Sequence, residues 1–143
     1  MLVELDDELA ASWTAVVEDR DDVLVVHGDV LEEPFWDHVH DPSEALVVGN
    51  IPFNITSPVI FRLLERPRPR EIVIMVQQEV ADRITASEGS RVYGALSVQM
   101  QWQFEVDILK RLSPGAFRPP PKVRSAFMRM RPLEESIQPA GAN

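Results

Sequence analysis

Residues 50 to 53 bring an amide, a proline and an aromatic ring together directly after an apolar segment. An exocyclic aromatic amine is a poor nucleophile, because its lone pair is delocalised into the ring. The side-chain oxygen of Asn50 and the backbone carbonyl of Ile51 can accept the two amine protons and localise that lone pair. Pro52 fixes the turn and offers no N–H donor, and the ring of Phe53 can stack on a flipped base. The run therefore predicts a site for a nucleobase amine; the alternative is an ordinary turn whose phenylalanine fills the core.

Two acidic residues follow earlier apolar segments in a similar way. Glu4 ends the first segment, and Asp29 follows the second after His27 and Gly28. In an open α/β sheet, ligands bind beyond the carboxyl ends of the strands. Glu4 is then placed to accept hydrogen bonds from ribose hydroxyls, and Asp29 to accept from an exocyclic amine. The alternative for each residue is an acid in a solvated loop.

These side chains need strands that end at one edge, and the apolar pattern predicts them. Short apolar runs alternate with segments of helical periodicity, and two adjacent strands follow. The order predicts an α/β fold with a mostly parallel sheet and an antiparallel end. The expected strands cover residues 2–5, 23–26, 46–48, 72–76, 104–112 and 123–131, and the expected helices cover 6–17, 58–65, 77–86 and 93–101.

Three details of this pattern are specific enough to check. Ser57 is a good N-cap, and Pro58 then falls at the first helical position. The continuous apolar run at residues 23–26 is typical of a strand that is buried on both faces. Residues 132–143 are expected to be a disordered tail beyond a domain that covers residues 1–131.

Composition excludes several classes of protein. The chain has 143 residues, of which 45% are hydrophobic, and this is enough for one domain with a single core. There is no apolar run of about 18 residues for a membrane span, no signal-peptide pattern and no cysteine, so we expect a cytoplasmic protein. Residues 37–41 combine two histidines and two aspartates, but Pro42 favours a solvated loop, and we predict no metal site.

The net charge of −9 is distributed unevenly. Residues 1–57 contain 14 acids and one base, whereas residues 58–131 contain 7 acids and 13 bases. The second half can therefore present a basic face to an anion while the first half repels it. The alternative is an acidic protein whose arginines lie on solvated faces.

The stretch Val-Gly-Asn-Ile-Pro-Phe-Asn-Ile-Thr-Ser-Pro, residues 48–58, closely resembles the target-amine motif of the ribosomal RNA adenine N6,N6-dimethyltransferases, the KsgA family. The resemblance continues through residues 77–83, 93–98 and 116–125, and covers roughly residues 2 to 132. Other adenine N6-methyltransferases and the macrolide-resistance rRNA methylases share the asparagine motif. Pro-Pro-Pro-Lys-Val after Ala-Phe indicates the KsgA family.

The resemblance implies a Rossmann-like class I fold that binds S-adenosylmethionine and methylates adenine N6 twice in small-subunit rRNA. Glu4 matches the residue that binds the cofactor ribose, and Asp29, with Val30 beside it, matches the contact to the cofactor adenine. The target-amine site matches Asn50, Ile51, Pro52 and Phe53, of which Asn50 also borders the cofactor. Phe117 matches an aromatic residue near the target base. Contacts to the rRNA of the immature small subunit are expected from Arg91, Arg118, Lys122 and Arg124.

The chain also departs from the family pattern. The family opens with a strand and a glycine-rich turn that hold the methionine part of the cofactor, and it ends with a helical domain; neither matches this sequence. We therefore expect an incomplete fold without its first central strand, no measurable binding of S-adenosylmethionine at micromolar protein, and oligomerisation through exposed sheet edges. Three alternatives stay open: a truncated methyltransferase, a non-catalytic remnant that binds RNA or the ribosome, and a fragment without a function of its own.

Overall fold

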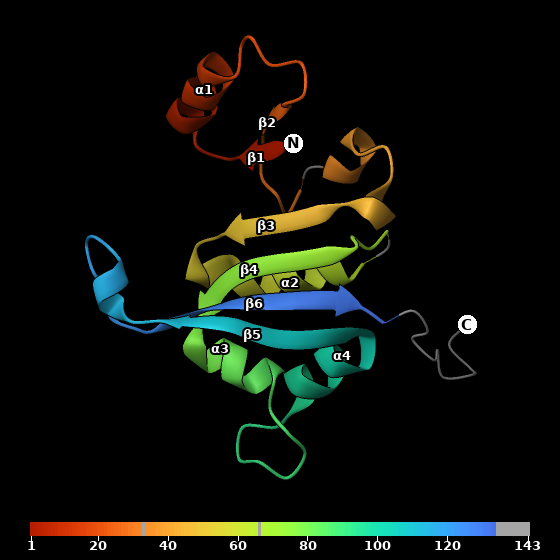
Figure 1. Cartoon of the computed structure of the whole chain (residues 1–143), viewed down its shortest axis with the longest axis vertical. Helices are drawn as coiled ribbons and strands as arrows, with labels where there is room; N and C mark the ends of the chain where they lie inside the picture. The colour runs from red at the N-terminus through yellow and green to blue at the C-terminus, as the bar shows by residue number, and fades with distance from the viewer. Residues whose placement is uncertain (33, 66, 134–143) are drawn as a thin grey trace.

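The computed structural model describes residues 1–32, 34–65 and 67–133 (Figure 1). Its strands and helices alternate as predicted until two long strands end the fold. The strands are β1 (Leu2–Glu4), β2 (Val25–His27), β3 (Leu46–Asn50), β4 (Glu71–Gln77), β5 (Phe104–Leu112) and β6 (Ser125–Pro132). The α-helices are α1 (Asp7–Val16), α2 (Thr56–Leu64), α3 (Gln78–Ile84) and α4 (Ala95–Gln103), and short 3-10 helices are η1 (Phe35–His38), η2 (Pro42–Glu44), η3 (Phe53–Ile55) and η4 (Pro114–Ala116).

The strands form two separate sheets rather than one. β1 and β2 pair in parallel, with Glu4 opposite His27. The larger sheet has the order β3-β4-β6-β5. β3 and β4 are parallel, and β6 runs antiparallel to both of its neighbours, so three of these four strands share one direction. This is the incomplete Rossmann-like α/β arrangement that the sequence predicts.

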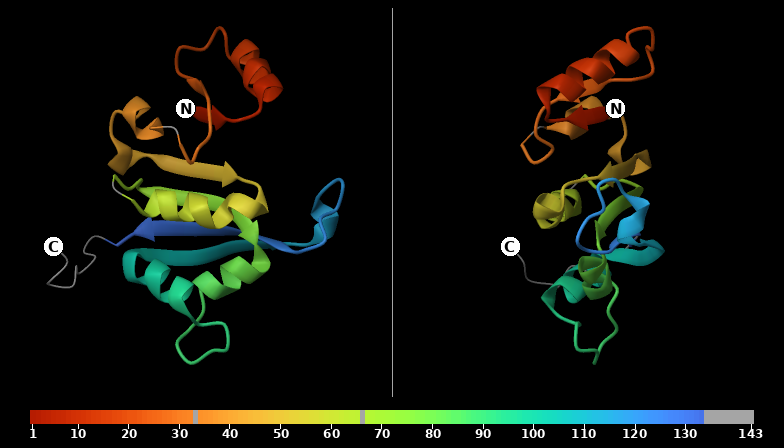
Figure 2. Two further views of the ribbon diagram at one scale, coloured as in Figure 1. Left: turned by 180° about the vertical axis from the view of Figure 1, so that it is seen from behind. Right: turned by 90° about the vertical axis from the view of Figure 1, so that its left-hand side faces the viewer.

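The core lies between the larger sheet and three helices on one of its faces. α2, α3 and α4 all cover the same face, as Figure 2 shows from behind. The register places buried side chains of β4 and β6 opposite one another there: Ile72 with Met130, Ile74 with Met128, and Val76 with Ala126. Fully burying an aliphatic side chain contributes about 1.5–3 kcal/mol, so these pairs anchor the sheet that carries Asn50.

The opposite face of the same sheet is polar where β5 meets β6. Arg129 donates to Asp107 at 2.8 Å, and Arg131 donates to Glu105 at 2.7 Å. The side chains of β6 therefore alternate between an apolar face and a charged face, as the sequence pattern indicates. The hydrogen bond to Asp107 raises the pKa of Arg129 above the ordinary value of arginine.

β1 and β3 flank a groove instead of pairing with each other. We call this feature the β1–β3 groove; it has a volume of about 580 Å³ and is lined by residues 1–3 and 45–51, among others. Among the described residues no strand lies between β1 and β3, so each of these strands pairs on one side. Leu46 is 52% exposed and Val48 is 69% exposed, because both point to the face of β3 opposite the one on which Val47 packs against the core.

The prediction that the run at residues 23–26 is buried on both faces is wrong. Leu24 is 44% exposed, and Val25 and Val26 are half-buried. The physical reason is that β2 belongs to a two-stranded sheet covered by α1, which cannot bury a strand on both sides. A continuous apolar run predicts a strand correctly here, but not its surroundings.

The predicted start of α2 is also wrong. α2 begins at Thr56, with Ile55 as N-cap and no side-chain cap from Ser57. η3 runs directly into α2, and the Thr56 N–H donates to the carbonyl of Phe53. Pro58 still lies in the first turn, where its missing N–H is not needed.

Several other boundaries differ by a few residues. Gln77 ends β4 and pairs with Ser125, so it is not helical. α4 begins at Ala95 rather than at residue 93, and β6 begins at Ser125 rather than at residue 123. Pro132 belongs to β6, so the tail does not start there. Residues 134–143, where most of the tail was predicted, lie outside the described residues.

Candidate functional site

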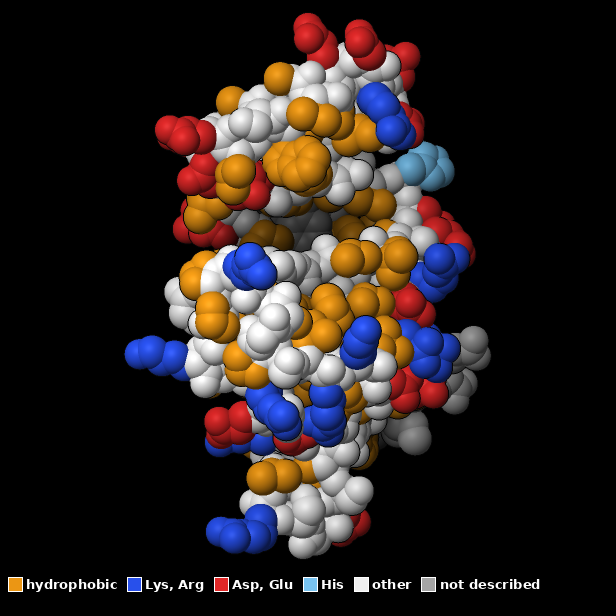
Figure 3. Space-filling view, turned by 60° about the vertical axis from the view of Figure 1, so that its left-hand side comes forward, with side chains coloured by type: hydrophobic (Ala, Val, Ile, Leu, Met, Phe, Trp, Pro, Cys, Tyr) orange, Lys and Arg blue, Asp and Glu red, His pale blue; other side chains and the backbone are white. Residues whose placement is uncertain are grey.

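A cavity opens where β1 and β3 end. It has a volume of about 730 Å³, and we call it the Glu4–Asn50 cavity. The cavity brings together six of the residues predicted from the sequence: Glu4, Asp29, Val30, Asn50, Ile51 and Pro52. Figure 3 views the molecule from this side and shows a hollow between the acid-rich N-terminal part and the larger sheet. Its volume lies within the ordinary range for small-molecule sites, roughly 300–1,000 Å³.

Glu4 is held in place by the turn that links β1 to α1. Its Oε1 accepts the backbone N–H of Asp6 at 3.0 Å, and its carbonyl accepts from Gly28 at 2.9 Å. Asp6 in turn caps α1 by accepting from the N–H groups of Glu8 and Leu9. Oε2 of Glu4 makes no hydrogen bond within the described residues, so it can accept from a ligand.

Asp29 is oriented by the tight turn after β2. Its Oδ1 accepts the backbone N–H of Leu31 at 2.8 Å, and its carbonyl accepts from Glu32 at 3.0 Å. These two bonds fix both the side chain and the backbone. The neighbouring Val30 is half-buried, lines the same cavity and also packs against the core. The carboxylate of Asp29 can therefore accept a hydrogen bond at the edge of a base, while Val30 contacts the face of the same base.

Asn50 lies at the end of β3, where it pairs with Met75 of β4. Gly49 allows β3 to approach its neighbour, because a Cβ there would lie 3.3 Å from Cγ2 of Ile74. The Asn50 side chain is exposed and forms no hydrogen bond within the described residues. β3 is thus two residues longer than predicted, and it carries the amide to the cavity.

Phe53 and Phe117 are not among the residues that line the Glu4–Asn50 cavity. Phe53 begins η3 and is half-buried. Phe117 is half-buried in the loop after η4, where its N–H donates to the carbonyl of Pro114 at 3.2 Å. Their predicted contact with a target base therefore stays a prediction.

The Glu4–Asn50 cavity is strongly acidic. Among the described residues five carboxylates line it and no lysine or arginine does: Glu4, Asp6, Asp7, Glu8 and Asp29. Such a wall favours hydroxyl groups, amines and a cationic centre, and it disfavours a ligand carboxylate. These residues fit the nucleoside and sulfonium parts of S-adenosylmethionine. They offer no cation for its amino-acid carboxylate.

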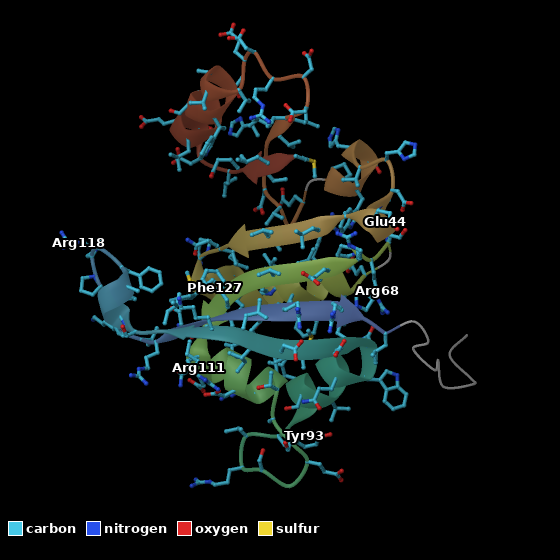
Figure 4. The ribbon with its side chains drawn as sticks, viewed as in Figure 1. Glu44, Arg68, Tyr93, Arg111, Arg118 and Phe127 are labelled. Atoms are coloured by element: carbon cyan, nitrogen blue, oxygen red, sulfur yellow. The ribbon has the colours of Figure 1, made fainter. Side chains whose placement is uncertain are left out.

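The cations predicted to contact RNA differ from most others in the chain. Arg91, Arg118, Lys122 and Arg124 are exposed, and none of them forms an ion pair with a described residue. Arg118 projects from the end of the loop between η4 and β6, as labelled in Figure 4. By contrast, Arg83 and Arg111 pair with Glu79 and Asp82. Free cations are available to phosphates without breaking an existing pair.

Sequence reasoning missed one further free cation. Lys110 on β5 is exposed and has no ion pair among the described residues. It lies at a bulge between Ile108 and Lys110, which shifts the register against β6. The alternation of apolar and polar residues in β5 does not reveal this bulge, so the sequence offered no signal that Lys110 would be free.

Comparison with known proteins agrees with this geometry. The sequence model of the family described as "Ribosomal RNA adenine dimethylase" matches residues 1–142. The chain belongs to this family. Its similarity to the ribosomal RNA adenine dimethylases thus covers both the Glu4–Asn50 cavity and the loop that carries the free cations.

Curated relatives and solved structures support the assignment to the ribosomal RNA adenine dimethylases. The chain is 39% identical to "Ribosomal RNA small subunit methyltransferase A" of Leptothrix cholodnii over 94% of this chain and 49% of the relative. It is 42% identical to the protein of the same name from Xanthomonas campestris pv. campestris, over 93% of this chain and 51% of the relative. The chain spans about half the length of the curated relatives it matches.

Two solved structures share the fold closely. A dimethyladenosine transferase from Plasmodium falciparum is 28% identical, with a TM-score of 0.79; the match covers 94% of this chain and 48% of the transferase. The 23S rRNA methyltransferase ErmE is 30% identical, with a TM-score of 0.78; the match covers 96% of this chain and 53% of ErmE. The structural similarity to these two proteins confirms the Rossmann-like class I fold for the described part of this chain.

Two negative observations complete the description of the site. Within residues 1–32, 34–65 and 67–133, no three histidine, aspartate or glutamate side chains gather in a group that could hold a metal ion. None of the helices in that same part of the chain combines the length and apolar character needed to cross a bilayer.

Proposed function

We propose that this chain carries the nucleoside-binding and target-amine residues of an S-adenosylmethionine-dependent rRNA adenine N6,N6-dimethyltransferase. The observation that carries the proposal is a single cavity that joins Glu4 and Asp29 to Asn50, although the two acids and the amide come from different sheets. The names of the curated relatives support small-subunit rRNA as the substrate and the immature small ribosomal subunit as the partner.

The acids of the cavity would hold the nucleoside end of the cofactor. When bound, S-adenosylmethionine supplies an activated methyl group on a cationic sulfonium. The free Oε2 of Glu4 would accept from the ribose hydroxyls, and Asp29 would accept from the adenine amine with Val30 against the ring. The acidic lining also favours the positive charge of the sulfonium.

Asn50 and Ile51 would prepare the target adenine for attack. Oδ1 of Asn50 and the carbonyl oxygen of Ile51 would each accept a hydrogen bond from one N–H of the N6 amine. These bonds would hold the amine protons out of the ring plane and so localise the lone pair on the nitrogen. No strong base is needed for this step, because positioning of the amine supplies most of the effect. Phe53, beside this pair in the chain, would stack on the flipped base.

The free cations would bind the rRNA backbone. Arg91, Arg118, Lys122 and Arg124 lie in the half of the chain with net positive charge, away from the acid-rich first half. Phosphate contacts of this kind supply affinity without reading sequence. RNA bound at these cations would present a base to Asn50, and the acids of the first half would keep phosphates away from the Glu4–Asn50 cavity. We expect this binding to take place in the cytoplasm.

The proposal is tested by comparing two ligands that differ in the amino-acid part. Methylthioadenosine has the nucleoside and the thioether, and S-adenosylhomocysteine adds the amino-acid carboxylate. Because the described lining of the cavity offers acceptors for the nucleoside and no cation for the carboxylate, we expect both ligands to bind weakly and with similar affinity in ligand-observed NMR titrations.

Variants of two acids make this test specific. Glu4→Gln should weaken both ligands roughly tenfold or more, because a hydrogen bond to a charged group contributes about 1.5–3 kcal/mol. Glu18→Gln, at an exposed residue outside the cavity lining, is the matched control and should bind like the wild type. Unchanged binding by the Glu4→Gln variant would contradict the proposed function.

A further inference from the structure

A second cavity opens at the carboxyl end of β4. It has a volume of about 340 Å³, and we call it the Gln78 cavity. Its wall includes residues from the end of β4, the start of α3, the loop before α4 and the loop before β6: Gln77, Gln78, Asp82, Val92, Val123 and Arg124. None of these residues lines the Glu4–Asn50 cavity. The volume is large enough for a ligand of the size of one nucleotide.

The Gln78 side chain of this cavity contains a buried polar atom without a partner among the described residues. Its Oε1 is buried and accepts no hydrogen bond within the described residues. A buried polar atom without a partner costs about 1–3 kcal/mol, and such atoms are rare in folded proteins. Because this oxygen has almost no exposed surface, a ligand in the cavity meets the N–H side of the amide instead. Nε2 makes no hydrogen bond within the described residues and is not among the buried atoms, so it can donate to an acceptor on a base edge.

The acids of this cavity are already neutralised by ion pairs. Glu79 accepts from Arg83 at 2.8 Å, and Asp82 pairs with Arg111 at 2.7 Å. These pairs disfavour a metal ion as the occupant, since both carboxylates have positive partners. They also lower the repulsion that an approaching phosphate would meet.

The remaining wall combines apolar surface with a free positive charge. Val92 is 48% exposed and Val123 is 41% exposed, so the cavity has apolar sides for the face of a ring. Arg124 is exposed and forms no ion pair with a described residue. Its backbone carbonyl accepts from the N–H of Gln78 at 2.9 Å, which fixes the guanidinium-bearing residue beside the amide.

The Gln78 cavity lies next to the target-amine residues along one edge of the sheet. Asn50 pairs with Met75, and Gln77 follows two residues later on β4. From the rise and spacing of strands, the Cα atoms of Asn50 and Gln77 are about 8 Å apart. This is a span that one nucleotide step of an extended single strand can cover.

We infer that the Gln78 cavity binds the nucleotide adjacent to the target adenine in single-stranded RNA. The amide of Gln78 contacts the base edge, Val92 and Val123 contact the base face, and Arg124 contacts the phosphate. The inference rests on the proposed function, because it places the neighbour of the base that Asn50 holds. It adds a contact that reads the neighbouring base rather than the RNA backbone alone.

The test uses the whole chain and two short fluorescent RNAs in anisotropy titrations. The first RNA is a single-stranded heptamer of uridines with one central adenine, and the second is the same RNA with abasic residues on both sides of the adenine. The wild-type chain should bind the first RNA at least fivefold more tightly than the second, since a well-placed amide–base contact discriminates by about that factor or more. Gln78→Ala should remove this difference and leave the affinity for the abasic RNA unchanged.

Three controls separate a base contact at Gln78 from a general loss of RNA affinity or of folding. Gln99→Ala changes an exposed amide on α4 and should bind both RNAs like the wild type. Asn50→Ala should weaken both RNAs equally, because it contacts the target base. Thermal melts of Gln78→Ala should match or exceed the wild type, since the change removes an unpartnered buried atom.

Each remaining outcome decides against the inference in a distinct way. If Gln78→Ala binds both RNAs like the wild type, or loses the same factor on each, the Gln78 cavity does not hold the neighbouring nucleotide, and the proposed function still stands. If the wild-type chain binds neither RNA, the proposed RNA-binding function is contradicted together with this inference.

Discussion

Glu4 and Asn50, the last residues of β1 and β3, line one cavity although β1 and β3 do not pair with each other. The two sides of the site are therefore held by different sheets, each with its own hydrogen bonds. β3 is fixed by β4 and the core, whereas β1 is fixed by β2 and α1. The geometry of the site thus depends on the groove between them.

The unpaired edge of β3 should favour association of the chain. Unpaired apolar edges are templates for pairing with another chain, and Val48 on this edge is 69% exposed. We expect Val48→Lys to shift the chain toward monomer in sedimentation velocity experiments, with little change in melting temperature because the residue is exposed. Leu9→Lys on α1, where Leu9 is 52% exposed, is the matched control away from the edge.

The same experiment can contradict this account of the edge. If wild type and Val48→Lys sediment as the same monomer, the edge does not drive association. The wild-type chain should also melt below about 65 °C, the upper end of the usual range for mesophilic domains. A sharp monomeric transition above that temperature would show that the open groove does not weaken the fold.

Asp41 makes a contribution to the stability of the fold that is lost at acidic pH. The hydroxyl and the N–H of Ser43 both donate to Oδ1 of Asp41, at 2.6 and 2.9 Å, and they lower the pKa of its carboxyl. A lowered pKa stabilises the fold above the pH at which a free aspartate titrates, and this contribution is lost as the pH falls through the lowered value. Ser43→Ala should raise the pKa of Asp41 in an NMR titration and reduce stability at neutral pH. An unchanged pKa would show that the hydroxyl bond is not formed in solution.

Substitutions of Phe53 distinguish a role in stacking on the target base from a role in packing the core. If its ring stacks on the target base, Phe53→Ala should weaken binding of adenine-containing RNA by about 1–3 kcal/mol, and Phe53→Tyr should bind like the wild type. Phe61→Ala on α2, where Phe61 is 44% exposed, is the control for loss of a half-exposed ring. If Phe53 is instead a core residue, thermal or urea melts should show a loss of about 3–5 kcal/mol with unchanged RNA affinity.

Much of the site was predictable because strand ends follow from local pattern. The apolar runs before Glu4, Asp29 and Asn50 predict three strands, and parallel strands bring their carboxyl ends to one edge. In the structure these three residues line one cavity. The boundaries of α2 were not predictable from Ser57 and Pro58, because η3 supplies the backbone acceptor that a side-chain cap would otherwise supply.

The Gln78 cavity and the exposure of Val48 depend on tertiary contacts that sequence patterns do not report. Gln78 reads as an ordinary helical residue, and only the structure shows that its buried Oε1 has no partner among the described residues. Val48 reads as a buried strand residue, and it is exposed because it points to the face of β3 opposite the one on which Val47 packs against the core. Local propensity cannot reveal which neighbours are present.

The central claim, that Asn50 activates an adenine amine for methyl transfer, is tested most directly by a methylation assay in a chimera. This chain replaces the matching half of the Xanthomonas campestris relative, and transfer of labelled methyl groups to small-subunit rRNA is measured beside thermal melts. We predict that the chimera methylates adenine N6 and that Asn50→Ala lowers the rate by about 10²–10³, the usual cost of losing a transition-state hydrogen bond, with an unchanged melting temperature. An Asn50→Ala chimera that methylates at the rate of the parent chimera would contradict the account.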